Sequence, residues 1–240
     1  ILLKGASQWP SSQQAEGGAA FADSLLRRLV QVTRENRDSP PMMDGISVST
    51  VMQAWVRQGQ PQRAQSWLQE LRKWQDDERH SDLGQIRPNN IMYTTIISGW
   101  AKAGSSEQAQ GVLDMQLQDF ESGNVDSKPD TTTFNRMLEC FATSKRHSSL
   151  EEAENLLDRM SYYGCTPNDE TWANFLACYA HHKPGRVPKL LKKLETEEGI
   201  SATIETYNRI LQGYAMASQM EVPSLRLLEM LEASEDIQPD

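Results

Sequence analysis

The sequence has few cysteines and no long apolar run, and these two absences exclude two classes of protein. Cys140, Cys165 and Cys178 are the three cysteines among 240 residues. Such an odd, sparse set favours a reducing compartment over a disulfide scaffold. No apolar run approaches the roughly 20 residues that a membrane-spanning helix needs. We therefore expect neither a disulfide-based fold nor a membrane span.

Motifs for phosphate binding and for catalysis are also missing. Gly17-Gly18 lacks the lysine and the preceding strand of a phosphate-binding loop. Cys178, His181 and His182 have a ligand-like spacing, but a structural zinc site needs about four ligands. A packed cysteine beside two solvated histidines is the favoured interpretation. We expect no catalytic residues, no metal and no cofactor.

An excess of positive charge is absent too. The formal net charge is −9 and the isoelectric point is about 5.0, whereas a nucleic-acid binder usually carries a basic stripe. The acidic residues cluster at 76–78, 151–154, 195–198 and 229–236, on predicted second helices or the loops after them. A solvated outer face is favoured there over an acidic docking surface. The charge of the whole chain therefore does not set the sign of its inner face.

What the sequence does contain is a helical hairpin, clearest from residue 88 onward. Ile96, Ile97 and Trp100 recur at helical spacing, and Gly104 ends this first helix with a tight turn. A second apolar stripe follows at Ala109, Val112, Leu113 and Leu117. Pro129 prevents the second helix from continuing. A hairpin this short needs neighbours to bury its apolar face, so copies are expected.

The copies are present along the chain. The pair Tyr93-Thr94 recurs as Phe134-Asn135, Trp172-Ala173 and Tyr207-Asn208, and more weakly as Val48-Ser49. The pattern predicts a partial repeat at 1–44 and five repeats at 45–89, 90–130, 131–168, 169–203 and 204–240. Polar loops are expected from Ser11 to Gly18 and from Asp119 to Ser127, with Gly123-Asn124 as a turn signal.

This pattern resembles the pentatricopeptide repeat family, most closely from Tyr93 to Gly104 and in the closing Pro129-Asp130. The resemblance implies an all-α fold, a right-handed α-solenoid of stacked helical hairpins. It places the first helices on the concave side and the acidic second helices on the outer side.

In that family each repeat reads one RNA base with two or three side chains. The resemblance assigns this to the fifth and the last residue of each repeat, namely Ser49 with Asn89, Thr94 with Asp130, Asn135 with Asn168, Ala173 with Thr203, and Asn208 with Asp240. By family analogy the pairs suggest adenine, guanine, a pyrimidine, no assignment, and uracil. The alternative is that these residues merely cap helices and turn the chain. Both interpretations stay open at this stage.

Two further positions bear on RNA binding in the family. The second residue of each repeat packs against a base, and here it is Ile46, Ile91, Thr132, Glu170 or Glu205. The thirteenth faces a phosphate, and here it is Arg57, Lys102, Thr143, His181 or Met216. Apolar and basic character are lost toward the C-terminus in both series. If RNA binds, the first two full repeats should therefore contribute most of the affinity.

Two functions follow as hypotheses. The first is an organellar RNA-binding adaptor that reads a short single-stranded RNA through its concave face. The second is a protein-interaction or structural solenoid, a subunit of a larger organellar assembly. The resemblance implies a mitochondrion or a chloroplast. Because the sequence begins at Ile1 and stops on a repeat boundary, we expect it to be part of a longer protein.

Overall fold

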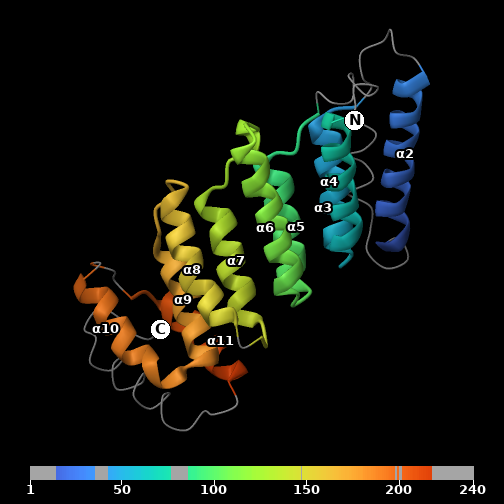
Figure 1. The fold of residues 1–240 in the computed structure, drawn as a ribbon. Coiled ribbons are helices and arrows are strands. Elements are labelled where there is room, and N and C mark those ends of the chain that lie inside the picture. The colour runs from blue at the N-terminus through green and yellow to red at the C-terminus, as the bar shows by residue number, and fades with distance from the viewer. Residues whose placement is uncertain are drawn as a thin grey trace. The chain divides into compact units, whose positions relative to one another are not determined.

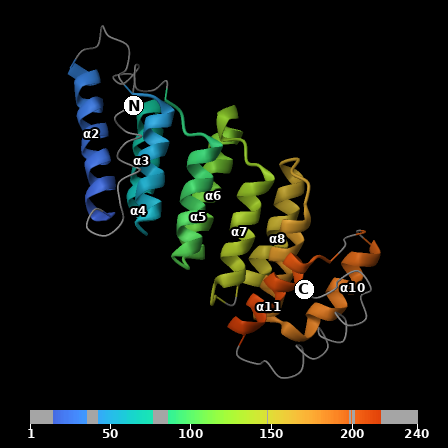
Figure 2. The same cartoon turned by 180° about the vertical axis from the view of Figure 1, so that it is seen from behind.

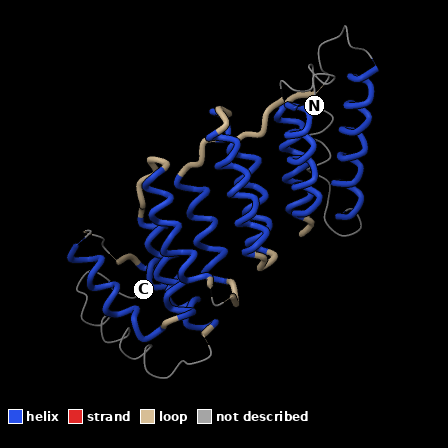
Figure 3. Tube along the Cα trace, in the orientation of Figure 1, coloured by secondary structure: helices blue, strands red, loops and turns tan. Residues whose placement is uncertain are grey.

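The computed structural model describes residues 15–35, 43–76, 86–146, 148–197, 199 and 202–217, and every regular element within these ranges is a helix (Figure 3). In chain order they are α2 (Ala15–Glu35), α3 (Gly45–Arg57), α4 (Pro61–Asp76), α5 (Asn90–Lys102), α6 (Ser106–Glu121), η2 (Val125–Ser127), α7 (Thr131–Thr143), α8 (Ser149–Tyr162), α9 (Asp169–His182), η3 (Pro184–Arg186), α10 (Val187–Glu197) and α11 (Ile204–Met216). The all-α prediction is confirmed for this part of the chain.

The helices form antiparallel hairpins in two compact halves. The N-terminal half comprises residues 1–103 with 107–129, and the C-terminal half comprises 104–106 with 130–240. Within each half, consecutive helices lie side by side in both views (Figures 1 and 2). Helices α3, α5, α7, α9 and α11 begin at Gly45, Asn90, Thr131, Asp169 and Ile204. These five are called first helices below, while the exact repeat boundaries stay a prediction.

Two of the predicted loops are wrong in part. Residues 15–18, expected in a polar loop, form the first turn of α2. Helix α6 continues past Asp119, whose side chain is buried and lies 2.9 Å from the guanidinium of Arg72. Beyond the helix, the amide of Asn124 donates a hydrogen bond of 2.8 Å to the carbonyl of Pro88. The inserted segment is therefore packed within the N-terminal half.

One polar side chain caps the start of each first helix. The capping oxygens of Asp44, Asn89, Asp130, Asn168 and Thr203 accept the backbone N–H groups of Ser47, Met92, Thr133, Thr171 and Thr206. A helix start has backbone N–H groups without intrahelical partners, and a short oxygen-bearing side chain satisfies one of them. The pairs Pro88-Asn89, Pro129-Asp130 and Pro167-Asn168 are thus helix starts as well as turns.

The N-terminal half is joined by one largely buried carboxylate. Asp23 on α2 accepts hydrogen bonds from the indole nitrogens of Trp55 on α3, at 3.2 Å, and Trp67 on α4. It also accepts one from Arg27 at 2.8 Å. Burial alone would raise the pKa of Asp23, but hydrogen bonds from Trp67, Arg27 and Trp55 outweigh it and lower this pKa. The charged carboxylate therefore links α2 to α3 and α4 through hydrogen bonds.

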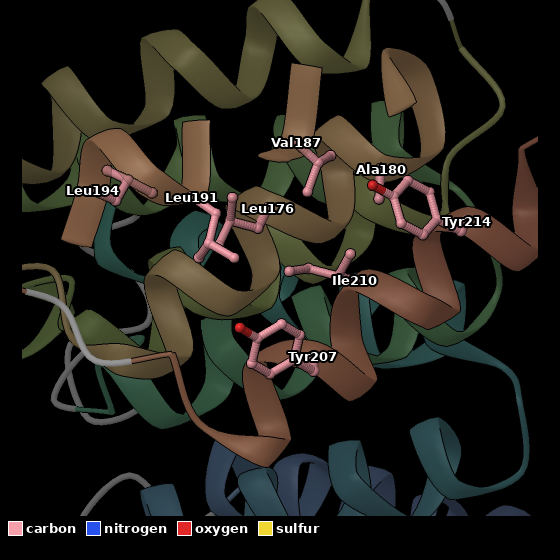
Figure 4. Close-up of a cluster of buried hydrophobic side chains, with 8 residues drawn as sticks. All are labelled: Leu176, Ala180, Val187, Leu191, Leu194, Tyr207, Ile210 and Tyr214. Carbon is pink, nitrogen blue, oxygen red and sulfur yellow. The ribbon is translucent and has the colours of Figure 1, made fainter. Parts of the chain in front are cut away.

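The C-terminal half has its own apolar core where α9, α10 and α11 meet (Figure 4). The core residues are Leu176, Ala180, Val187, Leu191, Leu194, Tyr207, Ile210 and Tyr214. They come from one face of each helix, as the helical spacing of apolar residues requires. This core positions the first helices α9 and α11 against each other.

A glycine at the tenth position allows first helices to approach closely. A Cβ built on Gly213 of α11 would lie 2.3 Å from the carbonyl oxygen of Ala177 and 2.8 Å from the Cβ of Ala180 on α9. The equivalent Gly99 of α5 would meet Val56 and Pro61 at 3.0 Å, at side-chain atoms only. The atoms that face Gly99 belong to side chains, which can shift, whereas the nearest atom to Gly213 is a backbone oxygen, which cannot.

We expect Asp23→Ala to lower the free energy of unfolding by about 1–3 kcal/mol, because it leaves buried indole N–H groups unpaired. Part of this stabilisation comes from the carboxylate charge, because the folded pKa lies below the ordinary value of 3.8. That part is full above this value and disappears as the pH falls through the folded pKa. Urea unfolding of both proteins across pH measures this, with the exposed Asp114→Ala as control. A difference that does not change at acid pH would contradict the assignment.

We expect Gly213→Ala to destabilise the protein by about 1–3 kcal/mol, because the added methyl meets a backbone oxygen that cannot move aside. Gly99→Ala should cost less, since only side-chain atoms are in the way. Gly111→Ala on α6 is the control, because its Cβ would meet nothing within 4 Å and alanine favours helix by up to about 1 kcal/mol. Thermal unfolding of the three variants gives the order of their melting temperatures. Equal melting temperatures for the Gly213 and Gly111 variants would refute the close approach.

Candidate nucleic-acid interface

The second residue of α3 and of α5 is an exposed isoleucine. Ile46 is 67% exposed and Ile91 is 61% exposed. Single exposed apolar side chains are ordinary on protein surfaces. Here, however, the same position is apolar and exposed in two first helices that pack against each other. The pair therefore forms a repeated apolar feature at the start of neighbouring helices.

An open cavity of about 670 Å³ lies at the starts of α3 and α5. Its lining residues are Met43, Asp44, Gly45, Ile86, Arg87, Asn89, Asn90, Ile91 and Asp126. Ligand sites commonly measure about 300–1,000 Å³. The structure thus brings the predicted site residues Asn89 and Ile91 together at one cavity, beside the exposed cation of Arg87.

The two predicted fifth-position hydroxyls of the N-terminal half are half-buried and bonded locally. The hydroxyl of Ser49 donates to the carbonyl of Ile46 at 3.1 Å, and that of Thr94 donates to Oδ1 of Asn90 at 3.4 Å. A hydroxyl that donates still has oxygen lone pairs that can accept. Among the described residues, no hydrogen bond joins Ser49 to Asn89.

The two predicted cations end these same helices. Arg57 and Lys102 are exposed and lie in the last turns of α3 and α5. Each stands eleven residues after the isoleucine of its own helix, which is about three turns. Isoleucine and cation therefore share one side of the helix, about 16 Å apart along its axis. This combination of an apolar start and a cationic end suits a base and a phosphate of one strand.

The third predicted pair is brought together, and its first member is buried while Asn168 is exposed. Asn135 on α7 is only 1% exposed. Its amide nitrogen donates to Oδ1 of Asn168 at 3.1 Å and to Glu170 at 3.0 Å. Its amide oxygen accepts from the hydroxyl of Thr171 at 2.7 Å. Both polar atoms of the Asn135 side chain are therefore hydrogen bonded within the protein.

An ion-pair network covers this part of the C-terminal half. Arg136 lies 2.7 Å from Glu139 and 3.5 Å from Glu170, and Arg209 lies 3.3 Å from Glu139. Burial would raise the pKa of Glu139, but the hydrogen bond and charge of Arg136, with the charge of Arg209, lower it. Sequence analysis missed this network. The available signal was an arginine at the sixth position of two repeats.

The remaining predicted positions vary in exposure. Thr132, Thr143, Glu205, Asn208 and Met216 are exposed. Ala173 is 2% exposed, and Asp240 lies outside the described residues. Asp130, the partner predicted for Thr94, caps α7.

The cysteine and histidine spacing does not assemble a metal site in the described residues. No group of three or more His, Cys, Asp or Glu side chains gathers there. His181 places Nδ1 2.9 Å from the carbonyl oxygen of Ala142. Burial, with the nearby charges of Glu154 and Glu152, raises the pKa of the Cys178 thiol to about 12, which keeps it protonated. These residues are thus engaged in packing.

Across the described part of the chain, none of the helices combines the length and apolarity that a membrane crossing requires.

Comparison with known proteins gives consistent results. The family model described as PPR repeat matches residues 46–75 and 91–115. One pentatricopeptide repeat-containing protein of Arabidopsis thaliana is 28% identical over 148 residues, 62% of this chain and 23% of the relative. Another from the same plant, named chloroplastic, is 20% identical over 215 residues, 86% of this chain and 25% of its own length.

The crystal structure of the pentatricopeptide repeat protein PPR10 from maize matches the whole chain. It aligns with 100% of this chain and 34% of its own, at 21% identity and a TM-score of 0.54. That likeness shows the fold. The chain spans about a quarter of the length of the two plant relatives and a third of the maize protein.

Proposed function

Because this chain carries pentatricopeptide repeats, we propose that it binds single-stranded RNA along its first helices, as an adaptor in a mitochondrion or a chloroplast. Repeats of this kind read RNA one base at a time. The proposal is one of binding, without a catalytic step. It places most of the affinity in the N-terminal half.

One observation carries the proposal more than any other. Ile91 is exposed at a cavity that Asn89 also lines, and Lys102 ends the same helix on the same side. An apolar side chain can pack against the face of a base, an amide can bond its edge, and an ammonium can contact a phosphate. Together, these three groups support the proposal that α5 contacts a single RNA strand at both of its ends.

The acidic net charge does not oppose this assignment. Arg57, Arg87 and Lys102 are all exposed in the N-terminal half. By contrast, Arg136 and Arg209 of the C-terminal half are tied up by Glu139. Among the residues at the predicted thirteenth position, the exposed cations are therefore those of α3 and α5.

A protein-interaction solenoid is the second candidate, and one observation favours it. Tyr162, at the end of α8, is 80% exposed and stands edge-on to Tyr163 at 5.0 Å between ring centroids. Exposed aromatic side chains are enriched at protein interfaces. Stable co-purifying proteins, together with no salt-sensitive RNA binding, would favour this function.

We expect Lys102→Ala to weaken binding to RNA of any sequence and to flatten its salt dependence. Each lost phosphate contact should lower the slope of log K against log salt by about 0.7, because fewer counterions are released. Filter binding of mixed-sequence single-stranded RNA across salt concentrations measures this. Met216→Ala, at the equivalent position of α11, should leave the slope unchanged. Equal and negligible effects of the two variants would support the protein-interaction function.

We expect Thr94→Asn to change which base is preferred, with little change in the salt slope. The exchange replaces a hydroxyl by an amide at a base-reading position, and a mismatched base should cost about 1–3 kcal/mol. Binding to RNAs that differ at one nucleotide measures the preference. An unchanged base ranking would remove Thr94 from the set of reading residues.

A further inference from the structure

Both amide protons and the oxygen of Asn135 already have partners within the protein, and the residue is 1% exposed. One of its two amide protons goes to Asn168 and the other to Glu170, and its oxygen accepts from Thr171. An asparagine side chain offers two donors and one oxygen acceptor. A base could therefore reach Asn135 only by displacing these partners, of which Asn168 and Thr171 are also bonded to each other at the start of α9.

Glu170 is the partner that covers Asn135 from the neighbouring first helix. One oxygen of its carboxylate accepts from the Asn135 amide at 3.0 Å, and the other lies 3.5 Å from Arg136. Arg136 is itself held by Glu139 at 2.7 Å, which also holds Arg209 of α11 at 3.3 Å. The carboxylate is thus fixed from two sides by a network across α7, α9 and α11.

The N-terminal half has a different side chain at the same position. There the second residue of the next first helix is Ile91, which cannot hydrogen bond to Ser49 or Asn89. The carboxylate side chain of Glu170 is 32% exposed, so a phosphate that approached Asn135 would also meet a negative charge. The two halves therefore differ at the second residue of the following first helix, which is an isoleucine in one and a hydrogen-bonding carboxylate in the other.

We propose that Glu170 is a specificity-determining residue that ends the base-reading surface, because it withholds the buried Asn135 from RNA. The inference rests on the proposed RNA-binding function and deepens it. In this proposal, the N-terminal half reads the bases, and base reading extends no further than α7. Replacing Glu170 by an apolar residue should add one reading position.

The test compares Glu170→Ile with Glu205→Ile. Glu205 has the equivalent position on α11 and is exposed, but it follows the repeat whose fifth residue is Ala173, which has no hydrogen-bonding side chain. Both variants lose one negative charge and gain the same side chain. Glu170→Gln is a third variant, which removes the charge but keeps an oxygen that can accept from Asn135.

The readout is the affinity for a series of single-stranded RNAs in which one nucleotide at a time is varied. Glu170→Ile should gain one additional position at which a wrong base weakens binding, by about 5- to 150-fold. Glu205→Ile and Glu170→Gln should bind somewhat more tightly at low salt, without a new base-sensitive position. Similar base profiles for Glu170→Ile and Glu205→Ile would overturn the inference and leave the proposed function intact.

A second measurement does not depend on RNA or on the stability of the isoleucine variant. Proton exchange of the Asn135 side-chain amide, followed by NMR, should be slowed in the wild-type chain and faster in Glu170→Ala, which removes the accepting oxygen. Rapid exchange in the wild-type chain would overturn the inference by itself. Slow exchange in a chain that binds none of the RNAs would instead refute the proposed function.

Discussion

The start of each first helix must satisfy backbone N–H groups, and this constraint organises the rest of the structure. Asn89 and Asn168 end their repeats and cap the following helices with a side-chain oxygen. The cap fixes where the helix begins, so it also fixes which residue stands second and which stands fifth. Capping and base reading are therefore compatible uses of one position. By fixing where α5 begins, the Asn89 cap also fixes the position of Ile91 at the cavity.

The two halves share one scaffold but differ in the side chain at the second position of their first helices. Ile46 and Ile91 leave apolar groups exposed, whereas Glu170 joins a hydrogen-bonded ion-pair network. An exposed ion pair contributes only about 0–1 kcal/mol to stability, and a typical hydrogen bond about 0.5–1.5 kcal/mol. The network of Arg136 and Glu139 is thus too weak to explain the fold of the C-terminal half. Under the proposed function, its effect is on which groups RNA can reach.

Local pattern predicted the helices well, because apolar spacing, caps and end glycines act over a few residues. The starts of α5 and α9 follow Asn89 and Asn168, both visible in the sequence. The burial of Asn135 was not predictable, since its partners are 33 to 36 positions away. The extension of α6 past Asp119 also depends on a distant partner, Arg72. Both features involve contacts between residues far apart in the sequence, which a local pattern does not specify.

The glycine at the tenth position has a consequence for the kind of nucleic acid that fits. Gly99 and Gly213 let neighbouring first helices approach closely, and packed helices lie about 8–10 Å apart. Successive bases in a stacked strand are only about 3.4 Å apart. Under the proposed function, bases read by adjacent helices cannot stay stacked on each other. The spacing of the helices thus selects an extended strand over a duplex before any base edge is read.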